Sequence, residues 1–171
     1  TELSTPLGAM ILAATDAVDP PAAGATGGLC GAWFVGQRHF DGPAADWRRD
    51  DAHPLLRAAA DQLQAWHAGR RRTFDLPLAP VGTAFQQAVW AALARLPFGT
   101  TTAYGALAAA VGRPAAARAV GAATGRNPLS IIVPCHRLVG RDGALTGYAG
   151  GIDRKRALLA FEAGAAPQAR A

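Results

Sequence analysis

The hydrophobic pattern changes near residue 80, from apolar runs of strand length to helical spacing. This change limits the chain to a fold that combines a sheet in its first part with packed helices in its second part. Before it, residues 8–15 (GAMILAAT) and 29–35 (LCGAWFV) are apolar runs of strand length. Residues 16–28, rich in Pro, Gly and Ala, predict a long loop between them. The sequence therefore predicts an α+β chain, with a small antiparallel sheet and a helix in residues 1–80 and a mostly helical domain in residues 81–171.

The first part has two further predicted elements. Residues 54–67 show helical spacing, and Pro54 suits the first turn of that helix. Residues 73–78 (TFDLPL) alternate and predict a third strand, and residues 78–83 predict a linker. The apolar face of the helix consists of Leu55, Leu56, Ala59, Leu63 and Trp66.

Three helices are predicted in succession after the linker. The first carries an apolar stripe and stops at Pro97, the second is capped by Thr102 and runs to Val111, and the third begins at Pro114. Two short helices joined by a turn that contains glycine match a helix-turn-helix, although an ordinary helical hairpin fits the pattern equally well. The stripe of the first helix consists of Phe85, Val89, Ala92, Leu93 and Leu96.

Charge is distributed unevenly along the chain. Residues 1–81 hold 7 Arg or Lys against 9 Asp or Glu, whereas residues 82–171 hold 10 against 3, for a total of +5. A basic second half favours a polyanion partner such as DNA. A general bias toward arginine is the alternative, but it does not explain why the first half is acidic.

The third helix of the second half has a face suited to a groove. Ala116, Val120 and Ala123 are spaced to face the core, so Arg118 projects outward from a surface of alanines. Small side chains allow close approach while one cation reaches further. A solvated arginine on an alanine-rich helix is the alternative.

Cys135 is the candidate nucleophile. It interrupts the apolar run 131–139 (IIVPCHRLV) and is followed at once by His136 and Arg137. A cysteine in such a run is more often an inert core residue, but an adjacent imidazole and cation favour the reactive thiolate. The other cysteine, Cys30, lacks this context, and both are expected to be free thiols in a reducing compartment.

Glu162 is the carboxylate available to orient His136. It shares one side of a predicted final helix, capped by Asp153, with Leu158 and Leu159. A carboxylate on that side needs a partner because unpaired burial is costly, unless the helix end frays into water. The expected relay runs from Glu162 to His136 to Cys135, with a water possible in the last step.

Several classes of protein do not fit the sequence. The remaining histidines lack the spacing of zinc ligands, and no signature of a papain-like protease surrounds Cys135. No apolar run approaches the roughly 20 residues of a membrane span, and no secretory signal is visible, so a cytoplasmic, DNA-associated protein is expected.

The second half resembles the O6-alkylguanine-DNA alkyltransferases. The most specific feature is PCHR at 134–137, preceded by NP at 127–128 and followed by GY at 147–148. The resemblance covers about residues 83–162 almost without gaps, and TPLGAMILAA and LCGAWF resemble the N-terminal domain more weakly. It implies an RNase H-like N-terminal domain and a winged-helix-like C-terminal domain. The stretches that carry it are FQQAVWAALARLPFGTTTAYGALAAAVG, AAARAVGAATGRNP and IIVPCHRLVG.

The resemblance implies direct, irreversible and stoichiometric repair, in which Cys135 takes the alkyl group from O6-alkylguanine in DNA. It implies that His136 deprotonates Cys135 through a water and that Glu162 orients the imidazole. Asn127 would brace the turn of the active site. Tyr104 would crowd the phosphate of the flipped nucleotide and hydrogen-bond the purine N3. A sensor of alkylated bases without catalysis is the competing hypothesis, but a sensor has no need of this thiol.

The resemblance also implies how DNA is bound. The helix-turn-helix would enter the minor groove of double-stranded DNA, with Arg118 replacing the extruded base. Gly105, Arg113 and Arg141 would also contact the DNA. The chain is expected to act as a monomer without a cofactor or metal, and cooperative binding and O4-alkylthymine repair are left open.

The substrate pocket would be lined by Tyr148, Ala149 and Leu138. Some relatives have a serine where this chain has Ala149, so a hydroxyl contact is lost there and a main-chain N–H would have to serve. The loop predicted at residues 16–28 is an insertion without an assigned role. The zinc site of some relatives has no counterpart in the sequence.

Overall fold

The structure is a computed structural model that describes residues 1–16 and 27–165. Most of the loop predicted at residues 16–28 therefore lies outside the described residues. Contacts divide the chain into two units, which are residues 1–81 with 128–132, and residues 82–127 with 133–171. The boundary predicted between residues 80 and 81 did not anticipate that residues 128–132 pack with the first unit. That the units fold as independent domains stays a prediction.

The first unit contains a three-stranded antiparallel sheet in the order β1-β2-β3. The strands are β1 (Glu2–Leu3), β2 (Met10–Thr15) and β3 (Gly28–Phe34). The small antiparallel sheet predicted from the apolar runs is thus confirmed. The second strand starts two residues later than predicted because Thr5–Gly8 form a turn in which Gly8 has a φ of 112°.

The prediction of a strand at residues 73–78 is wrong. The Gln62 side chain binds both main-chain groups of Asp75. Its Nε2 donates to the Asp75 carbonyl and its Oε1 accepts from the Asp75 N–H, over 2.9 Å each. These groups are therefore not available to a neighbouring strand. Only the end of the segment meets the sheet, where Leu78 forms an isolated parallel bridge with Leu29. The third strand is β1 instead.

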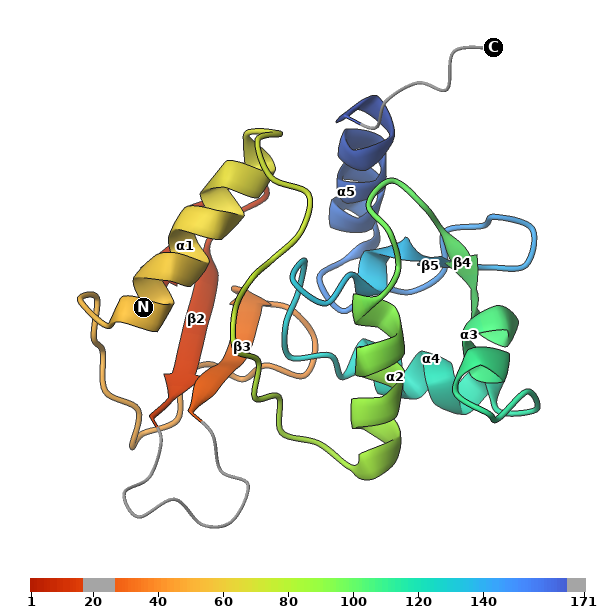
Figure 1. Cartoon of the computed structure of the whole chain (residues 1–171), viewed down its shortest axis with the longest axis horizontal. Coiled ribbons are helices and arrows are strands. Elements are labelled where there is room, and N and C mark those ends of the chain that lie inside the picture. The colour runs from red at the N-terminus through yellow and green to blue at the C-terminus, as the bar shows by residue number, and fades with distance from the viewer. Residues whose placement is uncertain (17–26, 166–171) are drawn as a thin grey trace. The chain divides into compact units, whose positions relative to one another are not determined.

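Helix α1 (Pro54–His67) has the bounds predicted from its spacing and packs on β2 and β3 (Figure 1). Pro54 occupies the first turn, where its missing N–H costs nothing. The buried residues of α1 are Leu56, Ala59, Leu63 and Trp66, four of the five predicted.

Residues 128–132 are held in the first unit by hydrogen bonds. Leu129 bridges Ala32, and the Ser130 hydroxyl donates to Gln37 Oε1 over 2.9 Å. Ile131 has a φ of 71°, a left-handed value that is rare for a β-branched residue. The segment that leads to Cys135 is therefore fixed in a strained backbone conformation by its surroundings.

The second unit begins with α2 (Ala84–Ala94), where Thr83 and Gln86 form a capping box. Thr102 does not cap the next helix as predicted. It belongs to β4 (Thr102–Ala103), which pairs in parallel with β5 (Leu138–Val139), so that α3 (Tyr104–Ala110) starts two residues beyond Thr102.

Helix α4 (Ala117–Gly125) also starts later than predicted. Pro114 lies in a turn closed by a 2.8 Å hydrogen bond from the Ala116 N–H to the Arg113 carbonyl. Val120 and Ala123 are buried and Arg118 is exposed, as predicted, whereas Ala116 of the predicted core face is half-buried and precedes the helix. Helices α3 and α4 pack on each other and on α2 (Figure 1).

The last helix, α5 (Ile152–Ala165), begins one residue before Asp153. Asp153 is therefore not the cap, but lies in the first turn, where the helix dipole favours a carboxylate. Within residues 1–16 and 27–165, no helix has both the length and the apolar character needed to cross a membrane.

The capping box gives a prediction for the stability of the second unit. The Thr83 hydroxyl accepts from the Gln86 N–H over 3.2 Å, and Gln86 Oε1 accepts from the Thr83 N–H over 2.8 Å. Thr83→Ala should lower the free energy of unfolding by about 0.5–2 kcal/mol in urea melts. Thr101→Ala, at an exposed residue outside the helices, is the control. Equal effects of the two changes would contradict the role of Thr83.

Candidate active site

Cys135 lies at the start of a short 3-10 turn, Cys135–Arg137, and only 5% of it is exposed. Its Sγ accepts a hydrogen bond of 3.1 Å from Asn127 Nδ2, which also donates to the Val133 carbonyl over 2.9 Å. Asn127 follows the end of α4 by two residues. One amide therefore ties the turn that carries the thiol to the end of the second helix of the helix pair.

The environment of Cys135 acts on its pKa in two directions. Burial raises the pKa of the thiol, while hydrogen bonds from Asn127 and Tyr148 and the charge of Lys155 lower it, and burial prevails. The resting thiol is therefore protonated at neutral pH. Its conversion to the nucleophilic thiolate requires a base.

His136 and Glu162 form the predicted pair. His136 Nε2 lies 2.9 Å from Glu162 Oε1, and the histidine is fully buried while 1% of Glu162 is exposed. The helix end therefore does not fray into water. The predicted need of Glu162 for a partner is met more fully than the sequence indicated, because two further residues also bind the carboxylate.

Arg137 and Gly99 are these additional partners. Arg137 Nε and Nη2 donate to Glu162 Oε2 and Oε1 over 2.9 and 2.8 Å, and the Gly99 N–H donates to Oε2 over 3.1 Å. Arg137 Nη1 also donates to the Leu96 carbonyl, and its guanidinium lies over the Phe98 ring. Glu162 thus joins α5, the Cys135 turn and the connection between α2 and β4.

These contacts decide the charge states of the pair. Burial alone would raise the pKa of Glu162, but hydrogen bonds from His136 and Arg137 lower it to about 2. Burial lowers the pKa of His136, so the imidazole is neutral and Arg137 supplies the counter-charge. A carboxylate only accepts hydrogen bonds, which assigns the imidazole proton to Nε2 and leaves Nδ1 as the basic atom.

Lys155 is a residue of the site that the sequence reasoning missed. It is fully buried on α5, and its Nζ donates to the carbonyls of Leu138 and Thr146 over 2.5 and 2.8 Å. Burial lowers the pKa of Lys155, and the charge of a Cys135 thiolate raises it. Two signals pointed to this residue, since it is the only lysine of the chain and stands seven positions before Glu162, on the same face of the helix.

The residues predicted to line a substrate pocket lie near this network. Tyr148 is half-buried and lowers the pKa of the Cys135 thiol. Leu138 is fully buried in β5, and its carbonyl receives the Lys155 ammonium. Ala149 is half-buried and follows Tyr148 directly.

The residues predicted to contact DNA lie on the helix pair and the loop after β5. Gly105 in the first turn of α3, Arg113 between the helices and Arg118 in the first turn of α4 are exposed, as is Arg141. Tyr104 is half-buried, and its hydroxyl accepts a hydrogen bond of 2.9 Å from Thr146 Oγ1. The structure therefore leaves the predicted cations accessible and holds Tyr104 in place.

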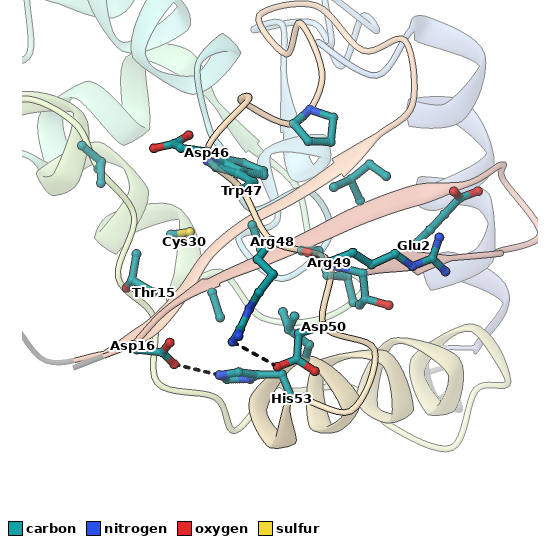
Figure 2. Close-up of a pocket in the computed structure, with 18 residues that line it drawn as sticks. Glu2, Thr15, Asp16, Cys30, Asp46, Trp47, Arg48, Arg49, Asp50 and His53 are labelled. Carbon is teal, nitrogen blue, oxygen red and sulfur yellow. Dashed lines mark hydrogen bonds and ion pairs between the residues drawn. The ribbon is translucent and has the colours of Figure 1, made fainter. Parts of the chain in front are cut away.

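A cavity of about 660 Å³ lies in the first unit and is lined only by residues of that unit (Figure 2). Two ion pairs lie in its lining, between Arg48 and Asp50 and between His53 and Asp16 (Figure 2). Cys30 lines the cavity as a free thiol, and burial raises its pKa. Cys135 is not part of the lining.

In the part of the chain that the structure describes, no group of three or more His, Cys, Asp or Glu side chains could hold a metal ion. Both cysteines are free, as expected.

Residues 84–164 match the family described as 6-O-methylguanine DNA methyltransferase, DNA binding domain. The fold and this match thus define a protein with the DNA-binding domain of that family. A methylated-DNA–protein-cysteine methyltransferase of Methanosarcina barkeri is 48% identical over 76% of this chain and 80% of its own length. One from Mycobacterium bovis is 57% identical over 64% of this chain and 66% of its own length.

A crystal structure of Mycobacterium tuberculosis OGT in complex with DNA superimposes with a TM-score of 0.83 at 42% identity, covering 98% of this chain and 94% of that one. The chain belongs to the methylated-DNA–protein-cysteine methyltransferase family, whose activity is repair of O6-methylguanine in DNA by transfer of the methyl group to a cysteine of the protein.

Lys155 gives a prediction about the pH dependence of the thiol. Its charge lowers the pKa of Cys135, so Lys155→Met should raise that pKa and move the appearance of the thiolate to higher pH. The measurement is the rate of Cys135 alkylation by iodoacetamide against pH, read by peptide mass spectrometry. Arg156→Met, at an exposed position of the same helix, is the control variant.

Cys30 in the same samples serves as an internal reference, because Lys155 is not among the groups that act on its pKa. A Cys135 curve that stays in place, or that moves together with the Cys30 curve, would show that Lys155 does not act on the thiol by its charge.

Proposed function

We propose that Cys135 is the acceptor in this repair reaction and that the chain takes the alkyl group from O6-alkylguanine irreversibly, once per molecule. The observation that carries the assignment is the buried network around this thiol, in which Asn127 binds Sγ and Glu162 holds the neighbouring His136. A cysteine that only fills a core needs no such network. Cys30, in contrast, lies in the other unit, and burial is the largest influence on its pKa.

The proposed step balances as a displacement at carbon. His136 Nδ1 takes the Cys135 proton through a water, and the sulfur attacks the alkyl carbon in line with the bond to O6. The S–C bond forms and the C–O6 bond breaks, with its electron pair going to the purine. The purine becomes guanine once it gains one proton, so that overall the thiol proton moves to the base. The thioether has no easy leaving group, and the protein is spent.

Each neighbouring residue has a role in this step. Glu162 keeps the imidazole oriented, and its low pKa keeps it ionised throughout the reaction. Asn127 braces the turn through the Val133 carbonyl. Tyr104 donates a hydrogen bond to the purine N3 and stabilises the charge that develops on the leaving base. Tyr148, Ala149 and Leu138 line the base pocket, where a main-chain N–H serves in place of the missing hydroxyl at Ala149.

The reaction also requires the base to leave the duplex, because O6 lies within the stack. We propose that α3 and α4 form a helix-turn-helix that enters the minor groove, and that the chain acts as a monomer. Arg118, exposed at the start of α4, fills the gap left by the flipped nucleotide. Gly105 lets the backbone of α3 approach the DNA, and Arg113 and Arg141 neutralise phosphates. The related structure solved with DNA supports this proposal.

The first prediction tests the acceptor. Incubation with duplex DNA that contains O6-methylguanine should add one methyl group to the peptide that holds Cys135 and none to the peptide that holds Cys30. Peptide mass spectrometry measures both, and Cys135→Ser provides the control in which the DNA stays methylated. Methyl on Cys30, or repair of more DNA than there is protein, would refute the assignment.

A second prediction separates base flipping from binding. Arg118→Ala should slow transfer from duplex DNA far more than transfer from free O6-methylguanine, because the free base needs no flipping and unstacking costs a few kcal/mol. Arg113→Ala should instead weaken binding similarly on damaged and undamaged duplexes. It should also reduce the slope of log affinity against log salt by about 0.9, the share of one phosphate contact.

The measurement is the pair of single-turnover rates, duplex and free base, for each variant, with binding titrations at several salt concentrations. If Arg118→Ala slows both rates equally, the residue acts on the structure of the site and the flipping role is wrong.

A further inference from the structure

Thr146 lies in the loop after β5 and connects this loop to the first turn of α3. Its hydroxyl donates to the Tyr104 hydroxyl over 2.9 Å, and its carbonyl accepts from Lys155 Nζ over 2.8 Å. The side chain itself is exposed, so this hydrogen bond does not serve to bury a polar group. We propose that Thr146 is a positioning residue for transfer, which orients the Tyr104 hydroxyl so that its proton points toward the substrate base. This inference rests on the proposed function of Tyr104 and Cys135.

The position of the Tyr104 ring is set by contacts on two sides. A Cβ placed on Gly121 of α4 would lie 3.3 Å from Tyr104 Cε1 and 3.5 Å from Cδ1, so the ring lies directly on the backbone of that helix. Thr146 then holds the far end of the ring at its hydroxyl. The ring and its oxygen are thereby fixed, and only the direction of the phenolic proton remains to be decided.

The hydrogen bond from Thr146 decides that direction. A phenol has one proton, and an oxygen that accepts a hydrogen bond keeps its own proton available for a different acceptor. The accepted bond also polarises the phenolic O–H, because linked hydrogen bonds strengthen one another. Thr146 therefore makes Tyr104 a donor aimed away from the loop, which is the state that assists departure of the guanine.

Lys155 holds the backbone of Thr146, the residue that donates to Tyr104. Its ammonium binds the main-chain carbonyl of Thr146, not the side chain, and it also binds the Leu138 carbonyl next to the Cys135 turn. The backbone from which the hydroxyl projects is thus held to the element that carries the nucleophile. A change confined to the Thr146 side chain leaves this clamp in place, so the two roles of the residue can be separated by mutation.

The test is a double-mutant cycle on the rate of methyl transfer to Cys135. Thr146→Val removes the hydroxyl and keeps the shape, Thr146→Ser keeps the hydroxyl, and Tyr104→Phe removes its partner. Thr146→Val should slow transfer by about two- to tenfold, which is the rate equivalent of one hydrogen bond between neutral groups. Thr146→Ser should stay near the wild-type rate. In the Tyr104→Phe background, Thr146→Val should have no further effect.

Two further readouts distinguish this role from a structural one. The slowing should be equal on duplex DNA and on free O6-methylguanine, unlike that of Arg118→Ala, because the purine N3 is present in both substrates. The affinity for undamaged duplex and the pH dependence of Cys135 alkylation by iodoacetamide should stay as in the wild type, because Arg118 and Lys155 are intact.

Two results would overturn the proposal for Thr146 alone, given a wild-type chain that methylates Cys135. One is an unchanged rate in Thr146→Val, and the other is a slowing that persists in full when Tyr104 is already phenylalanine. A wild-type chain that leaves Cys135 unmodified would instead overturn the proposed function and the role of Thr146 with it.

Discussion

The active site depends on one buried carboxylate. Glu162 is almost completely withdrawn from solvent, and burial of an ionised carboxylate without partners would be prohibitive. His136 and Arg137 of the Cys135 turn and the Gly99 N–H bind its two oxygens, and both segments are at least 25 positions from Glu162 in the sequence. Removal of one partner of such a buried pair typically costs about 3–5 kcal/mol. The ionised carboxylate therefore holds the Cys135 turn, α5 and the connection after α2 together.

This pairing also sets the chemistry of the neighbouring groups. Because Arg137 balances the charge of Glu162, the imidazole of His136 can stay neutral and keep a basic nitrogen. In the proposed reaction, the thiol of Cys135, whose pKa burial raises, stays protonated until His136 takes its proton. A protonated thiol resists oxidation and unwanted alkylation, which protects a protein that, as proposed, reacts only once. The proposed base therefore controls when the thiol becomes reactive.

The surface proposed to face DNA and the site that holds the thiol are held by the same residues. Asn127 follows α4 and binds Sγ, while Tyr104 begins α3 and lies on Gly121 of α4. Lys155 holds the loop after β5 to the strand that follows the Cys135 turn. If the helix pair docks on a duplex as proposed, the docking also places the Cys135 thiol, because hydrogen bonds join the thiol and the loop after β5 to the two helices.

The sequence by itself determined the features that depend on local pattern. The spacing of apolar residues gave the bounds of α1, the outward direction of Arg118 and the inward direction of Glu162, because a helix repeats every 3.6 residues. The residues around Cys135 distinguished it from Cys30. Local pattern failed where backbone groups had other partners, as at residues 73–78, where Gln62 takes the main-chain groups of Asp75, and at Thr102, which pairs with β5.

Only the tertiary structure decided which distant groups meet. That Arg137 and Gly99 share Glu162, that Lys155 binds the Leu138 carbonyl and that Thr146 binds Tyr104 depends on contacts between residues 17 to 63 positions apart. Periodicity shows that a side chain faces inward, but it carries no information about which residues that side chain contacts in the folded protein. Electrostatics then selects the arrangement, because each buried charge is stable only where the folded chain brings donors and acceptors to it.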